Sequence, residues 1–71
     1  MASYIRFDFI NDNKFADIYD NLKELLEHTN YFYHETFRDE EEYNENKEFK
    51  TLKEAIILWE GSGYGIARIM K

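Results

Sequence analysis

The alternation of hydrophobic and polar residues predicts that the chain begins with a strand over residues 3–10. Aromatic and β-branched residues alternate there with mostly polar ones at a period of two. We expect Phe7 and Phe9 to face the core. The run Asn11-Asp12-Asn13 then ends the strand, and its side chains suit a turn or the start of a helix.

A helix is predicted over residues 14–28, because hydrophobic residues recur there at helical spacing. They form one stripe that consists of Phe15, Ile18, Tyr19, Leu22, Leu25 and Leu26. Charged residues lie off this stripe. Thr29-Asn30 is a suitable helix exit.

Residues 31–37 are predicted to form a second strand, since aromatic residues dominate the segment. Both of its faces carry aromatic side chains, which is typical of a central strand. A continuation of the preceding helix is the alternative interpretation.

The next residues, 38–48, form an acidic segment with no apolar stripe. Four consecutive acids, Asp39 to Glu42, repel one another, so we expect a mobile or solvated loop that projects from the fold. A short helix through residues 40–47 is the alternative, because Glu and Lys favour helix intrinsically.

Thr51 and Glu54 have the spacing of a capping box and predict a second helix. Its core face consists of Leu52, Ala55, Ile56 and Trp59. Gly61 is expected to end this helix, since glycine takes the left-handed conformation at little steric cost. Residues 64–70 are predicted to form the last strand.

These elements predict an α+β fold: a small single domain, residues 1–71, with the order β-α-β-α-β and a three-stranded sheet with two helices packed on it. The acidic segment is an insert in this domain. A chain this short buries only about 60% of the surface that its unfolded form exposes. It contains no cysteine for a disulfide or a thiolate metal site. A homodimer would add burial and cover a free sheet edge.

The charge of the chain is concentrated in one region. The net charge is −6, and residues 35–48 hold seven acids and two bases, which is −5. An acidic protein repels phosphate backbones, so we expect no direct nucleic-acid binding. The amino terminus does not have the pattern of a signal peptide, and no apolar run could span a membrane. A soluble, cytoplasmic protein is expected.

The sequence offers little support for catalysis, so we expect no enzyme activity, no catalytic residue, no cofactor and no metal. His28 and His34 have no third ligand at a matching spacing. Asp8 and Glu35 are the best carboxylate candidates because they lie in apolar segments, but Asp8 is expected on the solvent side. The glycines of residues 61–65 precede a strand, whereas phosphate loops precede a helix.

The acidic segment is therefore the main functional candidate. Carboxylates along a surface can imitate a phosphate backbone and bind a groove lined by Lys and Arg. A neighbouring tyrosine suits an interface core. The expected partner-binding residues are Asp39, Glu40, Glu41, Glu42, Tyr43, Glu45 and Glu48. A purely solubilising loop on a small homo-oligomeric structural or regulatory domain is the alternative.

In its size, its acidity, its lack of cysteine and the run Asp39-Glu40-Glu41-Glu42-Tyr43, the chain resembles phage-encoded inhibitors of host machinery. These include anti-CRISPR proteins and other nucleic-acid mimics. The resemblance is one of class, and no motif of a particular member is matched. It implies a non-enzymatic inhibitor in the host cytoplasm that presents an acidic surface to a basic nucleic-acid-binding protein of the host defence or replication machinery.

Overall fold

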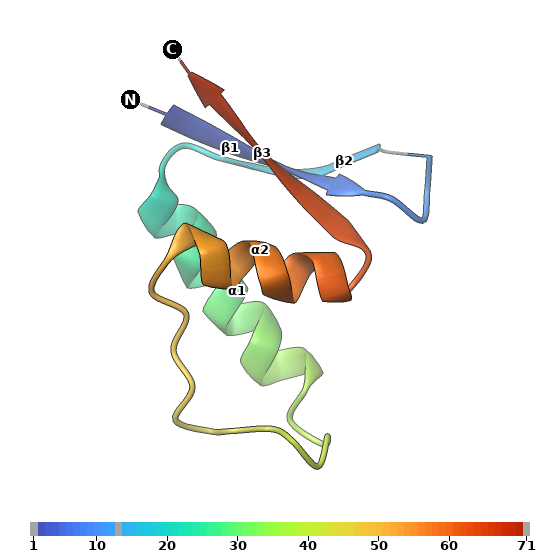
Figure 1. Ribbon diagram of the computed structural model, residues 1–71, viewed down its shortest axis with the longest axis vertical. Coiled ribbons are helices and arrows are strands. Elements are labelled where there is room, and N and C mark those ends of the chain that lie inside the picture. Colours follow the sequence, from blue (N-terminus) through green and yellow to red (C-terminus); the bar gives the residue numbers. More distant parts are fainter. Residues whose placement is uncertain (1, 13, 71) are drawn as a thin grey trace.

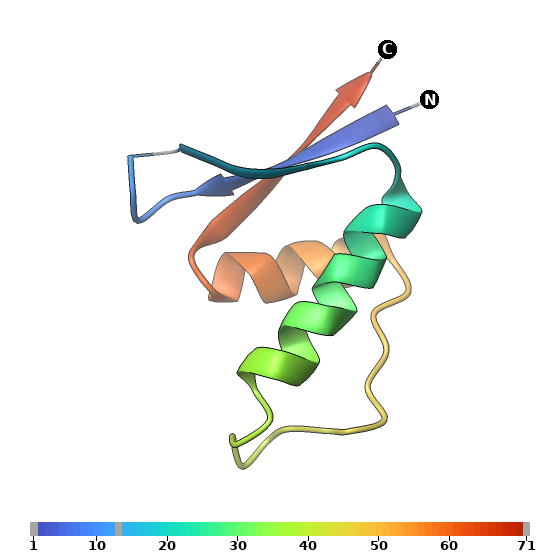
Figure 2. The same cartoon turned by 180° about the vertical axis from the view of Figure 1, so that it is seen from behind.

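The fold combines one antiparallel sheet with two helices, in a computed structural model that describes residues 2–12 and 14–70. The elements are β1 (Ala2–Asp8), β2 (Lys14–Tyr19), α1 (Leu22–Thr36), α2 (Leu52–Gly61) and β3 (Tyr64–Met70). Both helices lie on the same side of the sheet (Figures 1 and 2). The predicted fold class is therefore confirmed: a small α+β domain with a three-stranded sheet and two helices packed on it.

β1 is the central strand of the sheet, whose order is β2-β1-β3. Both of its neighbours run antiparallel to it, with Tyr4 opposite Tyr19 in β2 and Arg6 opposite Ile66 in β3. The register between β1 and β2 shifts once, between Arg6 and Phe7. The shift leaves Ala16 as an extra residue in β2, which is a β-bulge.

The assignment of residues 14–37 from the sequence was wrong in detail. The predicted helix over residues 14–28 is a strand up to Tyr19, and the predicted strand over residues 31–37 belongs to α1 as far as Thr36. The elements therefore follow as strand, strand, helix, helix and strand. The apolar stripe over residues 15–26 combined two segments, because its first half lies on the sheet and only its second half lies on a helix.

The turn after β1 closes a β-hairpin and does not cap a helix. The Asp8 carboxylate accepts hydrogen bonds from the backbone amides of Ile10, at 2.9 Å, and Asn11, at 3.2 Å. Asp12 takes a positive φ of 61°, a conformation that Asp tolerates better than most residues. Asn13 lies outside the described residues.

α1 instead begins at a cap eight residues after Asn13, at Asn21. The Asn21 side chain accepts a hydrogen bond from the Glu24 amide at 2.9 Å, and the Glu24 carboxylate accepts one from the Asp20 amide at 2.8 Å. The first bond satisfies an amide that the first helical turn leaves free, and the second fixes the chain just before the cap. The helix then runs through the aromatic residues to Thr36, which confirms the alternative interpretation of residues 31–37.

α2 begins with the predicted capping box. Thr51 accepts from the Glu54 amide at 3.2 Å, and the Glu54 carboxylate accepts from the Thr51 amide at 3.1 Å. The end of the helix differs from the prediction: Gly61 is its last residue, and the positive φ, 93°, occurs at Gly63. Gly63 donates its amide to the Glu60 carbonyl at 3.1 Å and so turns the chain into β3.

The core lies between the sheet and the helices and centres on Trp59, which is fully buried together with Leu25 and Ala55. The indole Nε1 of Trp59 donates a hydrogen bond to Thr29 Oγ1 at 2.9 Å. A buried indole N–H usually finds such a partner. This bond joins α2 to α1 at the centre of the domain.

The strand β1 presents the opposite face to the core from the one that we predicted. Tyr4 is buried there, and the Arg6 guanidinium lies 4.3 Å from the centre of the Trp59 ring. Phe9, by contrast, is 58% exposed. Arg6 can face the core because its planar guanidinium stacks on an aromatic ring. Phe7 and Phe9 consequently lie on the other face of the sheet.

Candidate protein-binding site

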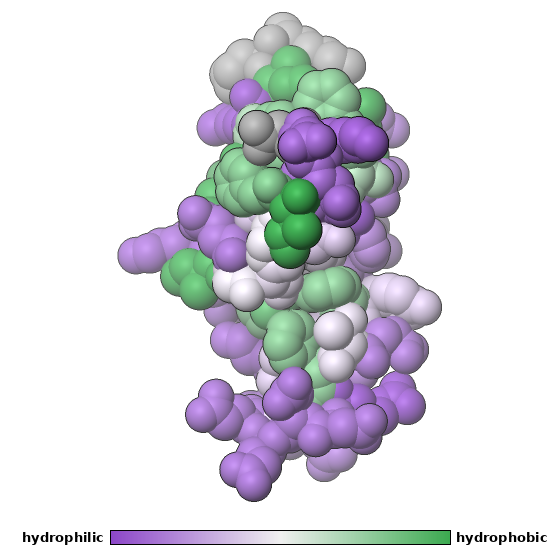
Figure 3. All heavy atoms as spheres, turned by 90° about the vertical axis from the view of Figure 1, so that its right-hand side faces the viewer, coloured by the Kyte–Doolittle hydropathy of each residue, from purple (hydrophilic) through white to green (hydrophobic). Residues whose placement is uncertain are grey.

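The acidic segment forms the end of the molecule farthest from the sheet, where it links α1 to α2 (Figure 1). Hydrophilic side chains cover this lower end in Figure 3. The segment is a series of turns and not a short helix. Its backbone hydrogen bonds run from Glu40 to Phe37, from Tyr43 to Glu40 and from Lys47 to Asn44, at 3.0–3.1 Å.

Two aromatic residues of α1 hold the segment in place. The Tyr43 hydroxyl lies 2.5 Å from His34 Nδ1, and His34 Nε2 lies 2.8 Å from the Lys47 carbonyl. A carbonyl can only accept, so Nε2 carries a proton, and in the neutral imidazole Nδ1 then accepts from Tyr43. In addition, the Asn44 amide donates to the Tyr33 hydroxyl at 2.9 Å. The segment is solvated, as predicted, but packs on α1 and is not a free projection.

The far end of the segment is fixed by Asn30. Its side chain accepts from the Phe49 amide at 2.7 Å and donates to the Phe49 carbonyl at 3.1 Å. The Phe49 side chain is 7% exposed. Close by, Lys47 pairs with Glu54 at 3.4 Å. Hydrogen bonds from the Lys50 amide and then from Thr51 hold the pKa of Glu54 below its usual range.

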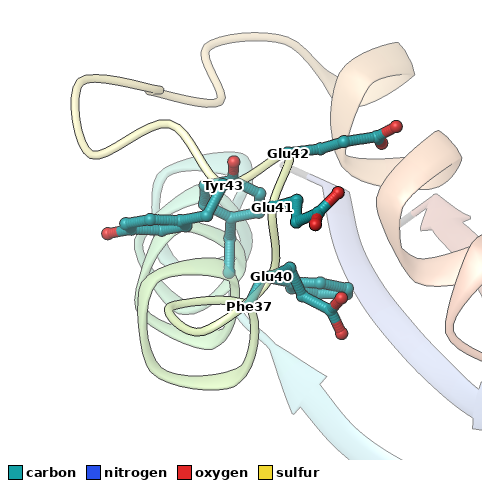
Figure 4. Close-up of a pocket in the computed structure, with 6 residues that line it drawn as sticks. Phe37, Glu40, Glu41, Glu42 and Tyr43 are labelled. Carbon is teal, nitrogen blue, oxygen red and sulfur yellow. The ribbon is translucent and has the colours of Figure 1, made fainter.

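A hollow of about 700 Å³ opens between the segment and α1. Its aromatic part consists of Tyr33, Phe37 and Tyr43, and its acidic part of Glu40, Glu41 and Glu42. The rings form a stack, since the Tyr33 ring lies 5.3 Å from Tyr43 and 5.6 Å from Phe37. The three carboxylates extend to the same side of the backbone, away from the Tyr43 ring (Figure 4).

The structure brings together four of the seven predicted site residues. Glu40, Glu41, Glu42 and Tyr43 line the hollow, whereas the remaining three do not: Asp39, Glu45 and Glu48. All six acids are exposed, and Tyr43 is half-buried. Within residues 2–12 and 14–70, none of the six acids forms an ion pair. Their charges are therefore available to a partner.

Tyr33 and Phe37 were missed as site residues because the strand prediction placed them in the sheet. Their spacing of four residues puts them on one face of a helix. The helical alternative for residues 31–37 would have placed both beside the acids. The cap at Asn21 and Glu24 is the sequence signal that favours that alternative.

The other polar candidates have structural roles. Asp8 closes the hairpin, and a hydrogen bond from the Asn11 side chain holds the pKa of its carboxyl below the usual range. Glu35 lies exposed on α1 and pairs with Arg38 at 3.8 Å. His28 Nδ1 lies 2.6 Å from the Tyr19 hydroxyl. Burial and the nearby Arg6 charge lower the pKa of this histidine.

In the part of the chain that the structure describes, no group of three or more His, Cys, Asp or Glu side chains could hold a metal ion. No helix in residues 2–12 and 14–70 is long and apolar enough to cross a membrane.

Comparison of this chain with protein-family models, with curated proteins and with solved structures found no match.

Proposed function

We propose that this chain is a non-enzymatic protein-binding inhibitor that presents its acidic segment to a nucleic-acid-binding protein. One observation carries the proposal. Glu40, Glu41 and Glu42 extend their carboxylates to one side of an anchored loop, beside a hollow with an aromatic lining. An inhibitor of this kind belongs to the class of phage-encoded anti-CRISPR-type proteins.

The acidic segment carries a run of consecutive charges, as a nucleic-acid strand does. Consecutive Cα atoms are about 3.8 Å apart, so Glu40, Glu41 and Glu42 place three carboxylates within a short stretch of backbone. A DNA strand carries one phosphate per about 3.4 Å of helix axis. A groove lined by Lys and Arg that binds phosphates can therefore bind these carboxylates.

The aromatic rings add a second kind of contact. An arginine side chain pairs with carboxylates through its forked N–H groups and stacks on aromatic faces. The hollow offers both, since Tyr33, Phe37 and Tyr43 line it together with the three glutamates. The site thus favours an arginine-bearing surface over one that carries only lysine.

The anchoring of the loop lowers the cost of binding. The bonds from Tyr43 to His34 and from Asn44 to Tyr33 fix the path of the backbone before a partner arrives. A preorganised loop loses less conformational entropy on association than a flexible one. Charge accelerates the encounter, and the ring contacts slow dissociation.

Affinity capture followed by competition tests this function. The immobilised protein is exposed to a host lysate at low and high salt, and the captured proteins are identified. We expect nucleic-acid-binding proteins that are retained at low salt and released by added duplex DNA or RNA. If the captured set is unaffected by both salt and nucleic acid, the acidic segment is not a nucleic-acid mimic. No specific capture would favour the alternative of a solubilising loop.

A further inference from the structure

The face of the sheet that points away from the helices is apolar across all three strands. Its residues alternate with those that face the core: β1 places Ser3, Ile5 and Phe7 on it, and β3 places Gly65, Ala67 and Ile69 on it. Cross-strand pairing adds Ile18, opposite Ile5, and Phe15, opposite Phe7. We call this set, together with Phe9, the outer face. Ser3 is its one polar member, and none of its members is charged.

The aromatic residues of the outer face are held on it by their neighbours. The Phe15 ring lies 5.6 Å from the Phe7 ring, so both point to the same side. Phe9 lies over Gly65, where an added Cβ would come within 2.5 Å of its ring. Glycine at this position therefore makes room for the phenylalanine. Neither helix covers this side of the sheet in either view of the fold (Figures 1 and 2).

Much of this apolar surface is open to solvent. Phe15 is 66% exposed, Ile18 61%, Phe9 58% and Ile69 37%, and Ile10, which lies over Gly63, is 77% exposed. Together these side chains expose on the order of 600 Å² of apolar surface. Patches of this size on soluble domains commonly mark interaction sites. Covering the patch on two copies would bury roughly 1,200 Å², the lower end of specific protein interfaces.

We propose that the outer face is the contact through which two copies of this chain form a homodimer, sheet against sheet. An apolar face meets its own copy without unpaired charge, since an isologous contact brings the same patch from both subunits together. Aligned packing of two such faces is the ordinary arrangement of a β-sandwich. The contact also gives β1 an apolar partner on both sides, as its sequence pattern requires.

The placement of the charge favours a second copy over a membrane or a nucleic acid. The net charge of −6 repels anionic lipids and phosphates. It does not prevent dimerisation, because the acidic segment lies at the other end of a molecule that is 39 Å long (Figure 1). Charges at that separation are screened at physiological salt, where the Debye length is about 8 Å.

Two lysine substitutions with matched exposure test the proposal. Ile18→Lys changes an outer-face side chain that is 61% exposed, and Ile57→Lys changes an α2 side chain that is 63% exposed. Both lower the net negative charge by one, so added repulsion between acidic chains cannot explain a difference between them. Circular dichroism and thermal unfolding confirm that each variant folds. Sedimentation and light scattering across a dilution series then give the mass.

For the wild-type chain we expect a mass of twice 8.7 kDa that falls to 8.7 kDa on dilution. Ile18→Lys should weaken association by about tenfold or more, since one buried isoleucine accounts for more than a decade in affinity. Ile57→Lys should dimerise as the wild type does.

Three results would overturn the proposal. The first is a wild-type chain that stays at 8.7 kDa up to its solubility limit. The second is an Ile18→Lys variant that dimerises normally, which would place the contact at a strand edge. The third is a monomer that binds to phosphatidylcholine vesicles and loses this binding on Ile18→Lys, which would assign the face to lipid.

Discussion

The Tyr43 hydroxyl donates a hydrogen bond to His34 Nδ1 at 2.5 Å and so fastens the acidic segment to α1. The same imidazole donates through Nε2 to the Lys47 carbonyl at 2.8 Å. One side chain of α1 therefore holds the segment at two points, and the three glutamates lie just before the first of them. The shape of the proposed site depends on this pair.

Replacement of Tyr43 by phenylalanine should destabilise the protein by about 1 kcal/mol, because it removes one hydrogen bond and keeps the ring. The same variant should speed hydrogen exchange at the amides that form the turns of the segment. Urea unfolding and exchange measured by NMR check both effects. Tyr31→Phe is the matched control, since Tyr31 is 64% exposed on the same helix. Equal behaviour of the two variants would mean that the bond does not order the segment.

Replacement of Thr29 by valine should have a larger effect. The hydroxyl accepts from Trp59 Nε1 and donates to the Leu25 carbonyl at 2.6 Å, and Thr29 is fully buried. Valine keeps the shape but leaves the indole N–H unpaired, at a cost of roughly 1–3 kcal/mol. Urea unfolding, monitored by the fluorescence of Trp59, measures this loss in the free energy of unfolding. Thr36→Val, at the exposed end of α1, should change stability little. A stable Thr29→Val protein would contradict this account of the core.

His28 should make stability depend on pH on the acid side. Burial and Arg6 lower its pKa below the ordinary value of 6.5, so the unfolded chain takes up a proton first as the pH falls. The stability from neutral His28 is complete above 6.5 and declines as the pH falls towards the folded pKa. The free energy of unfolding, measured on both sides of pH 6.5, should slope less in His28→Gln. His34 is present in both proteins, so identical slopes would refute the prediction.

Tyr19 should make the stability of the protein depend on pH on the alkaline side. Burial raises its pKa from 10.0 to about 12, so the folded chain keeps a proton that the unfolded chain loses. The stability that protonated Tyr19 contributes is complete below pH 10.0 and is lost as the pH rises towards about 12. The tyrosinate absorbance of Tyr19→Phe, subtracted from that of the wild type, isolates this one group in the folded protein. A difference curve centred near 10.0 would show that burial does not hold the proton.

The sequence predicted best where a local signal acts alone. The capping box of Thr51 and Glu54, the helix that follows it and the final strand all occur as expected. In each case the determining contacts lie within a few residues. The fold class followed from these elements, together with the first strand.

Prediction failed where a strand and a helix share one continuous pattern of apolar residues. Phe15 and Ile18 continue the helical spacing of Leu22 and Leu25, but they contribute to the outer face of the sheet. The central strand β1 has apolar residues on both faces, so its alternation does not reveal which face meets the helices. The stacking of Arg6 on Trp59 fixes which face of β1 meets the helices. These two residues are 53 positions apart in the chain, so no local pattern contains the contact.

The candidate site was predicted in part for the same reason. The acids of residues 39–42 were evident from composition alone, since a charge run needs no fold to be recognised. The aromatic lining needed the correct secondary structure, because the helix that runs to Thr36 places Tyr33 between Phe37 and Tyr43.

The central claim is that these carboxylates bind a basic partner, and a pair of triple variants tests it most directly. Glu40→Gln, Glu41→Gln and Glu42→Gln together remove three charges at the site. Asp20→Asn, Glu27→Gln and Glu60→Gln together remove three exposed charges elsewhere, so both proteins change from −6 to −3. At low salt, capture of the nucleic-acid-binding proteins should be lost with the first variant and retained with the second, at unchanged melting temperature. Equal capture by the two variants would contradict the account.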